Sequence, residues 1–108
     1  MNEATKLAVI STIREIDRRL FNHEEAARLA RVPIRSLLKY WNAGLIHPCN
    51  DYQRFGIYFD EGAIYRIRKA ESIRANLQTN IASASTIFSL YEEIDRLKQE
   101  LRFQRESP

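Results

Sequence analysis

The apolar positions of residues 21–48 repeat at the spacing of two short helices joined by a turn. Asn22 can cap the first helix, and Glu25, three residues later, completes a capping box. Pro33 suits the first position of the second helix, and Gly44 stands where a left-handed residue would end it. Two short helices joined by a tight turn form a helix-turn-helix, which we expect over about residues 22–43. The expected apolar positions are Ala26, Ala27, Leu29 and Ala30 in the first helix and Ile34, Leu37, Leu38 and Trp41 in the second.

Residues 45–59 predict a small β wing. We expect a strand to start at residue 45, a turn from Pro48 to Asp51, and a return strand from Gly56 to Phe59. Most of the wing's aromatic side chains should pack against the helices; they are Tyr52, Phe55, Tyr58 and Phe59.

Residues 1–20 are ambiguous. Their apolar residues keep helical spacing, whereas the run Val-Ile-Ser-Thr-Ile favours a strand. A strand beside the wing and an N-terminal helix therefore both stay open.

Two further helices follow the wing. Asp60 can cap the third helix, whose buried face should comprise Ala63, Ile64, Ile67, Ala70, Ile73 and Leu77. Asn80 can cap a last helix that begins at Ile81. In that helix, apolar residues step by 3, 4, 3 and 4 and form a heptad stripe of Ile87, Leu90, Ile94, Leu97 and Leu101. The heptad stripe could pair two copies into a homodimer or fold back onto its own domain.

These elements together predict a mainly α protein: a winged helix-turn-helix with a small β wing and a long C-terminal helix. We divide the chain into an N-terminal extension over residues 1–20, the winged domain over 21–79 and an amphipathic helix over 80–105. At 108 residues the chain suits one domain overall.

Charge is concentrated in the half that holds the helix-turn-helix. Residues 1–55 carry nine Lys and Arg against six Asp and Glu, whereas residues 56–108 carry eight of each, so the net charge of +3 lies in the first half. If the protein binds nucleic acid, we expect the contacts to be made by the basic side chains of Arg31, Arg35, Lys39 and Arg54. Arg35 and Lys39 are spaced i,i+4 and should share one exposed face, although a plain solvated surface explains them equally well.

Catalytic, metal and cofactor sites are not expected. His47 and Cys49 are close in sequence, but a nucleophilic cysteine needs an oriented base. Zinc needs about four ligands, and the chain offers one cysteine and two histidines. A single cysteine, no apolar run of membrane-spanning length and no signal-peptide block predict a cytoplasmic location.

Two segments resemble the MerR-like winged-helix group. The segment LLKYWNAGLIHP is similar to that group's RYYEEIGLLxP element, and IYFDEGAI is similar to its YRxYseedl element. Two arginines by which MerR-type regulators contact the phosphate backbone are Leu38 and Ile57 in this chain. The resemblance implies the fold, while the two departures should weaken DNA binding.

A closer resemblance is to the CbpM-like chaperone modulators, a branch of that group that inhibits by binding protein. It runs from Phe21 to about Arg105, and its most specific part is YFDEGAIYRIRKAESIRANLQTNIASASTIFSLYEEIDRLKQE. This chain differs in its net basic charge and longer N-terminus.

The resemblance implies binding to the J-domain of a CbpA- or DnaJ-like co-chaperone, which blocks stimulation of a DnaK-type chaperone. J-domains display a basic helix, so the binder should offer carboxylates, for which the candidates are Asp60, Glu61, Glu92, Glu93 and Asp95. The alternative is a MerR-like DNA-binding transcriptional regulator.

Overall fold

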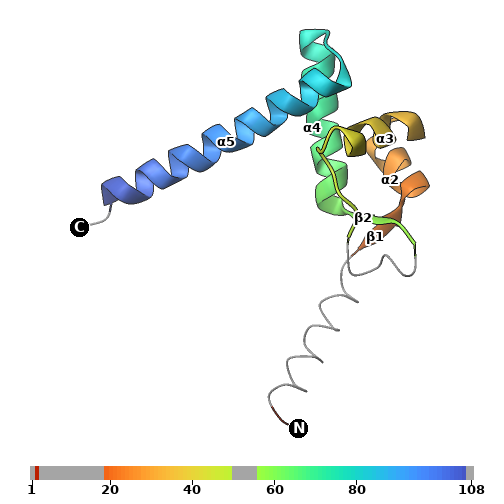
Figure 1. Ribbon diagram of the computed structural model, residues 1–108, viewed down its shortest axis with the longest axis horizontal. Coiled ribbons are helices and arrows are strands. Elements are labelled where there is room, and N and C mark those ends of the chain that lie inside the picture. The colour runs from red at the N-terminus through yellow and green to blue at the C-terminus, as the bar shows by residue number, and fades with distance from the viewer. Residues whose placement is uncertain (1, 3–18, 50–55, 107–108) are drawn as a thin grey trace.

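A computed structural model describes Asn2, residues 19–49 and residues 56–106. The elements in order are β1 (Leu20–Asn22), α2 (His23–Ala30), α3 (Ile34–Asn42), β2 (Tyr58–Asp60), α4 (Glu61–Leu77) and α5 (Ile81–Glu106). This part of the chain is mainly helical with one two-stranded antiparallel sheet, which confirms the mainly α prediction (Figure 1). Among these elements no helix is both long and apolar enough to cross a membrane. Most of the predicted N-terminal extension and the wing turn, including Tyr52, Arg54 and Phe55, fall outside the described residues.

The ends of α2 and α3 follow the local signals in the sequence. The Asn22 side chain accepts a hydrogen bond from the Glu25 N–H at 2.8 Å, which confirms the predicted cap. Arg31 adopts a left-handed conformation in the turn between the helices, with φ of 62°. Pro33 is the residue before α3, one position earlier than expected. Gly44 has φ of 83°, as predicted for the residue that ends the second helix.

The sheet is built differently from the predicted hairpin. Strand β2 pairs with β1, with Leu20 opposite Asp60 and Phe21 opposite Phe59. Residues 45–49 form no strand, so the strand predicted to start at residue 45 is wrong. Leu45 and Ile46 are instead buried in the core, and the backbone N–H of Cys49 donates to the Tyr58 carbonyl at 2.8 Å.

The core lies between α2, α3, α4, β2 and the first turns of α5. Its largest fully buried side chains are Tyr40, Phe59, Leu37, Leu45, Ile46 and Ile67. The Trp41 and Phe59 rings meet edge to face, with 5.5 Å between their centroids.

Four residues predicted for the apolar faces of α2, α3 and α4 are exposed instead. Leu38 is 47% exposed, and Tyr40 takes the buried position in α3 because its hydroxyl finds a hydrogen-bond partner. Ile34 and Leu29 are exposed as well. Leu77, expected in the buried face of α4, is exposed because α4 ends there and leaves its last turn uncovered.

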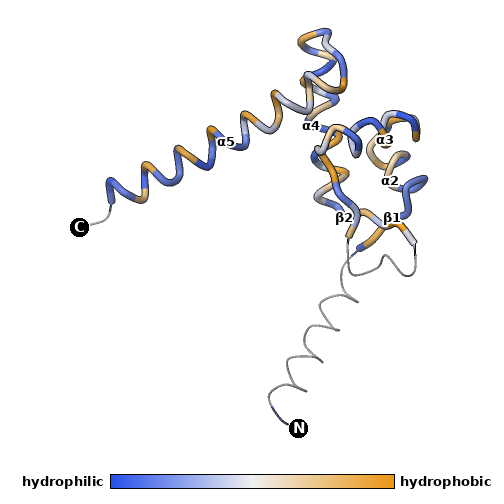
Figure 2. Tube along the Cα trace, in the orientation of Figure 1, coloured by the Kyte–Doolittle hydropathy of each residue, from blue (hydrophilic) through white to orange (hydrophobic). Residues whose placement is uncertain are grey.

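Helix α5 contacts the domain only in its first part, from Ile81 to Glu92. Its cap is the predicted one, because the Asn80 side chain accepts from the Ser83 N–H at 2.7 Å. Ala84, Ser85 and Phe88 are buried, while every residue from Ser89 to Glu106 is exposed. The helix therefore extends away from the domain, with apolar and polar residues alternating along it (Figures 1 and 2). The alternative that the heptad stripe folds back onto its own domain is wrong beyond Ile87, which is half-buried.

Candidate functional site

A guanidinium group fixes the joint between the domain and α5. Arg66 on α4 donates from Nε to the Leu45 carbonyl at 2.7 Å and forms an ion pair with Glu92 on α5. The same guanidinium lies 4.8 Å from the centroid of the Phe88 ring. One side chain thus joins α4, the segment after α3 and the third and fourth turns of α5. The sequence pattern placed Arg66 away from the buried face and gave no indication of this role.

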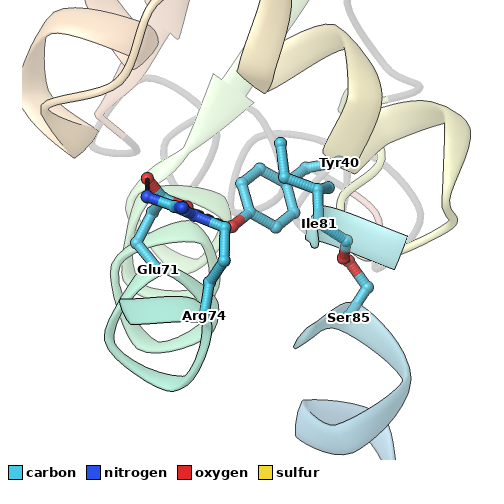
Figure 3. A network of polar contacts seen from close by, with 5 residues as sticks. All are labelled: Tyr40, Glu71, Arg74, Ile81 and Ser85. Atoms are coloured by element: carbon cyan, nitrogen blue, oxygen red, sulfur yellow. Dashed lines mark hydrogen bonds and ion pairs between the residues drawn. The ribbon is translucent and has the colours of Figure 1, made fainter. Parts of the chain in front are cut away.

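A second polar network lies under the start of α5 (Figure 3). The Tyr40 hydroxyl donates to Glu71 Oε2 at 2.5 Å, and Arg74 Nε donates to the same oxygen at 2.7 Å. Beside them the Ser85 hydroxyl donates to the Ile81 carbonyl at 2.8 Å, within α5. The network links α3 to α4 through a tyrosine that the sequence pattern did not select.

These contacts shift two ionisation equilibria. Burial, reinforced by the hydrogen bond to Glu71, raises the pKa of the Tyr40 hydroxyl far above its usual value. Burial also tends to raise the pKa of the Glu71 carboxyl, but the hydrogen bonds from Arg74 and Tyr40 and the Arg74 charge outweigh it, so that pKa is lowered. At neutral pH the pair is therefore a neutral phenol and a carboxylate.

An open groove of about 660 Å³ runs beside this network. It is lined by the exposed side of α3, the end of α4 and the start of α5, including Lys39, Arg74 and Asn80. Glu71 also lines the groove, but its carboxylate is already held by Tyr40 and Arg74. Most of the surface that lines the groove is apolar, and Lys39, Asn42 and Asn80 are among its polar lining residues.

Three basic residues on α3 and on the turn before it are exposed. Arg31 lies in the turn, and Arg35 and Lys39 project from one side of α3. None of the three side chains forms an ion pair or hydrogen bond within the described ranges 19–49 and 56–106. The adjoining positions are apolar, since Ile34 and Leu38 are exposed on the same short helix.

The five predicted acidic residues come from two elements, and four of them have internal partners. Asp60 caps α4 by accepting from the Ala63 N–H at 3.1 Å, and Glu61 lies 3.9 Å from Arg19. On α5, Glu92 pairs with Arg66, and Glu93 pairs with Arg96, whose hydrogen bond lowers the pKa of the Glu93 carboxyl. Asp95 is exposed and has no ion-pair or hydrogen-bond partner among the described residues.

The heptad stripe is a continuous apolar surface. Its members beyond Ile87 are between 45% and 56% exposed, namely Leu90, Ile94, Leu97 and Leu101. Tyr91 and Phe103 add exposed aromatic surface on the same helix. An exposed apolar row of this kind marks a protein-binding surface more often than an ordinary solvated face.

No protein-family model matches the sequence, and no curated protein matches it at a significant level.

Proposed function

We propose that this protein is a non-catalytic regulator with a MerR-like winged helix-turn-helix fold. In this proposal it binds the J-domain of a CbpA- or DnaJ-like co-chaperone and inhibits its stimulation of a DnaK-type chaperone. The proposal starts from the resemblance of residues 21–105 to CbpM-like modulators. Exposed apolar and acidic side chains among the described residues support it.

One observation carries the proposal. The two positions at which MerR-type regulators hold the phosphate backbone with arginine are here Leu38 and Ile57, which are 47% and 45% exposed. Exposed leucine and isoleucine contribute nothing to phosphate binding, whereas apolar side chains supply the centre of protein interfaces. A surface that has exchanged cations for apolar groups at these positions suits a protein partner better than a duplex.

The acidic side chains supply a complement to the basic helix of a J-domain. Asp95 and Glu61 are the most available, because Asp95 has no partner among the described residues and Arg19 holds Glu61 only loosely. Glu92 keeps one carboxylate oxygen without a partner among the described residues, whereas Arg96 donates to both oxygens of Glu93, so that Glu93 can accept a further cation only through the remaining lone pairs of those oxygens. Asp60 is a poor choice for a contact residue, since its side chain is needed to cap α4.

Calorimetry of this protein against an isolated J-domain tests the proposal. We expect saturable binding of micromolar or tighter affinity, about −8 kcal/mol. Asp95→Lys should weaken that binding about tenfold, or ~1.4 kcal/mol. The matched control is Glu24→Lys, an equally exposed charge reversal on α2. The absence of binding by the parent protein would reject the function, and equal affinity for both variants would reject the assigned surface.

DNA binding is the second candidate, and it is favoured by Arg35 and Lys39 on α3, which are exposed and have no ion-pair partner among the residues that the structure describes. In the helix-turn-helix geometry the second helix enters the major groove, which would place both cations against a duplex. The double variant Arg35→Ala with Lys39→Ala should then abolish retardation of duplex DNA, with steep loss of affinity in rising salt. J-domain binding by the same double variant should stay unchanged if the first candidate is correct.

A further inference from the structure

We propose that the groove between α3 and the start of α5 binds a small carboxylate with an apolar body, of the medium-chain alkyl carboxylate class. The groove has a volume of about 660 Å³, within the range of about 300–1,000 Å³ that is typical of small-molecule sites. This binding is separate from the J-domain contact and does not rest on it.

The apolar surface of the groove comes from small side chains on two elements. Pro33 and Ala43 flank the two ends of α3, and Ile81 and Ala82 begin α5. Ile81 also packs against the core, so the fold fixes the position of this wall. Because small apolar side chains leave the groove open and present carbon to it, the body of the ligand should be apolar.

Lys39 gives the groove its unpaired charge. The other charged lining residues are Glu71 and Arg74, and Arg74 donates to both oxygens of the Glu71 carboxylate at 2.7 and 3.3 Å. The Tyr40 hydroxyl donates to one of the same oxygens, so Glu71 and Arg74 are already held by each other and by the fold (Figure 3). Lys39 is exposed and has no ion-pair or hydrogen-bond partner in the described part of the chain. The charge left for a ligand is therefore positive, and the complementary ligand is an anion.

Amide groups favour a carboxylate as that anion. The Asn80 side chain accepts from the Ser83 N–H through its carbonyl oxygen, which leaves the NH₂ group of the same amide as a donor for a ligand. Asn42 is exposed and lines the groove together with Lys39. An ammonium group and amide N–H groups can donate to the two oxygens of a carboxylate, whereas Lys39 repels a cation of the same shape.

Amide chemical shifts of the full-length protein test the site with three probes. Octanoate has both required groups, acetate lacks the alkyl chain, and octyltrimethylammonium has the opposite charge. We expect saturable shifts with octanoate alone, centred on lining residues such as Asn42 and Ala82. The absence of saturable shifts with octanoate would overturn the proposal. So would equal binding of octyltrimethylammonium, or octanoate shifts centred on residues 90–101, which would indicate adsorption to the exposed apolar surface of α5.

Removal of one charge tests the role of Lys39. Lys39→Met keeps an extended side chain without the ammonium group and should weaken octanoate binding by about fivefold. The matched control is Arg35→Met, because Arg35 is an exposed cation on the same helix that is not among the lining residues of the groove. Unchanged binding by Lys39→Met, or an equal loss in both variants, would contradict the assigned contact.

Filling the groove tests its location without a change of charge. Ala82→Trp should abolish octanoate binding, because the indole would occupy the space of the alkyl chain. Ala75→Trp is the control, since Ala75 is exposed on α4 outside the groove and should leave the affinity unchanged. Octanoate binding by Ala82→Trp with the affinity of the parent protein would overturn the proposal.

Discussion

The Tyr40 hydroxyl on α3 donates to the Glu71 carboxylate on α4 across a separation of 31 residues in the sequence, with 2.5 Å between the oxygens. Tyr40 is fully buried, so this hydrogen bond replaces the water that the phenol would otherwise bind. It connects α3 to α4, the helix that carries Arg66.

Removing the hydroxyl should destabilise the domain. Tyr40→Phe keeps the ring in the core but leaves Glu71 with Arg74 as its remaining partner in this network. We expect a loss of about 1–2 kcal/mol in the free energy of unfolding, measured by urea denaturation. Tyr91→Phe, on the exposed part of α5, is the control and should change stability by less than about 0.5 kcal/mol. Equal stability of the two variants would contradict the role given to the network.

The same network predicts that the free energy of unfolding decreases at acid pH. The lowered pKa of Glu71 means that the unfolded chain binds a proton at higher pH than the folded chain does. Stability from this group is present above the usual glutamate pKa of about 4.3 and falls as the pH drops below it. Glu71→Gln should flatten that part of the pH profile, measured as urea midpoints between about pH 3 and 6.

At alkaline pH we expect the free energy of unfolding to decrease as the pH rises. The raised pKa of Tyr40 means that the folded chain keeps its proton after the unfolded chain has lost it. Stability from this group is present below the usual tyrosine pKa of about 10 and falls as the pH rises above it. A spectrophotometric titration should show Tyr40 ionising only with unfolding, and Tyr40→Phe should remove one such late-ionising phenol.

Loss of the Arg66 side chain should loosen α5. Arg66→Ala leaves the Leu45 carbonyl without its donor and Glu92 without its cation, at an expected cost of about 1–3 kcal/mol. Hydrogen exchange should rise first in the initial turns of α5, around Ala84 and Phe88. Lys98→Ala is the control, since it removes a cation from the exposed part of α5 without touching the domain. A uniform rise across α2 and α3 would instead indicate a global loss of stability.

Two left-handed positions should respond in opposite directions. Gly44 has φ of 83° with open space around a built Cβ, so Gly44→Ala should cost about 1 kcal/mol through backbone strain alone. Gln78 ends α4 with φ of 52°, so Gln78→Gly should stabilise the protein by about 0.5–1 kcal/mol. Thermal or urea unfolding of both variants tests this prediction. A change of stability in the same direction for both would contradict it.

The predictions that hold are the ones that depend on a few neighbouring residues. Asn22, Asp60 and Asn80 each accept from the backbone three residues later, as the sequence indicated. A side-chain cap is decided within one turn of helix, so its signal is complete in a short segment. The heptad stripe could be recognised for the same reason, because its spacing is contained within one helix. Whether the stripe is covered depends on how far along α5 the rest of the domain reaches.

The errors concern contacts between distant residues. The sequence suggested a hairpin between residues 45 and 59, yet β2 pairs with β1, about 40 residues earlier. Tyr40 and Arg66 were missed because each is amphipathic, and only the folded chain shows that Glu71 and Leu45 lie within reach. Periodicity shows which positions can be buried but not which partner makes burial of a polar group favourable.

The attachment of α5 at one end makes this helix a lever. The pivot is the contact of Arg66 with Glu92 and Phe88, and the free arm from residue 93 to residue 106 is about 21 Å long. A rotation of about 10° at the pivot would move the tip by about 4 Å, the rise of two to three helical residues. A partner that touches only the Arg66 joint would therefore displace the exposed apolar residues at the far end of α5 without contacting them.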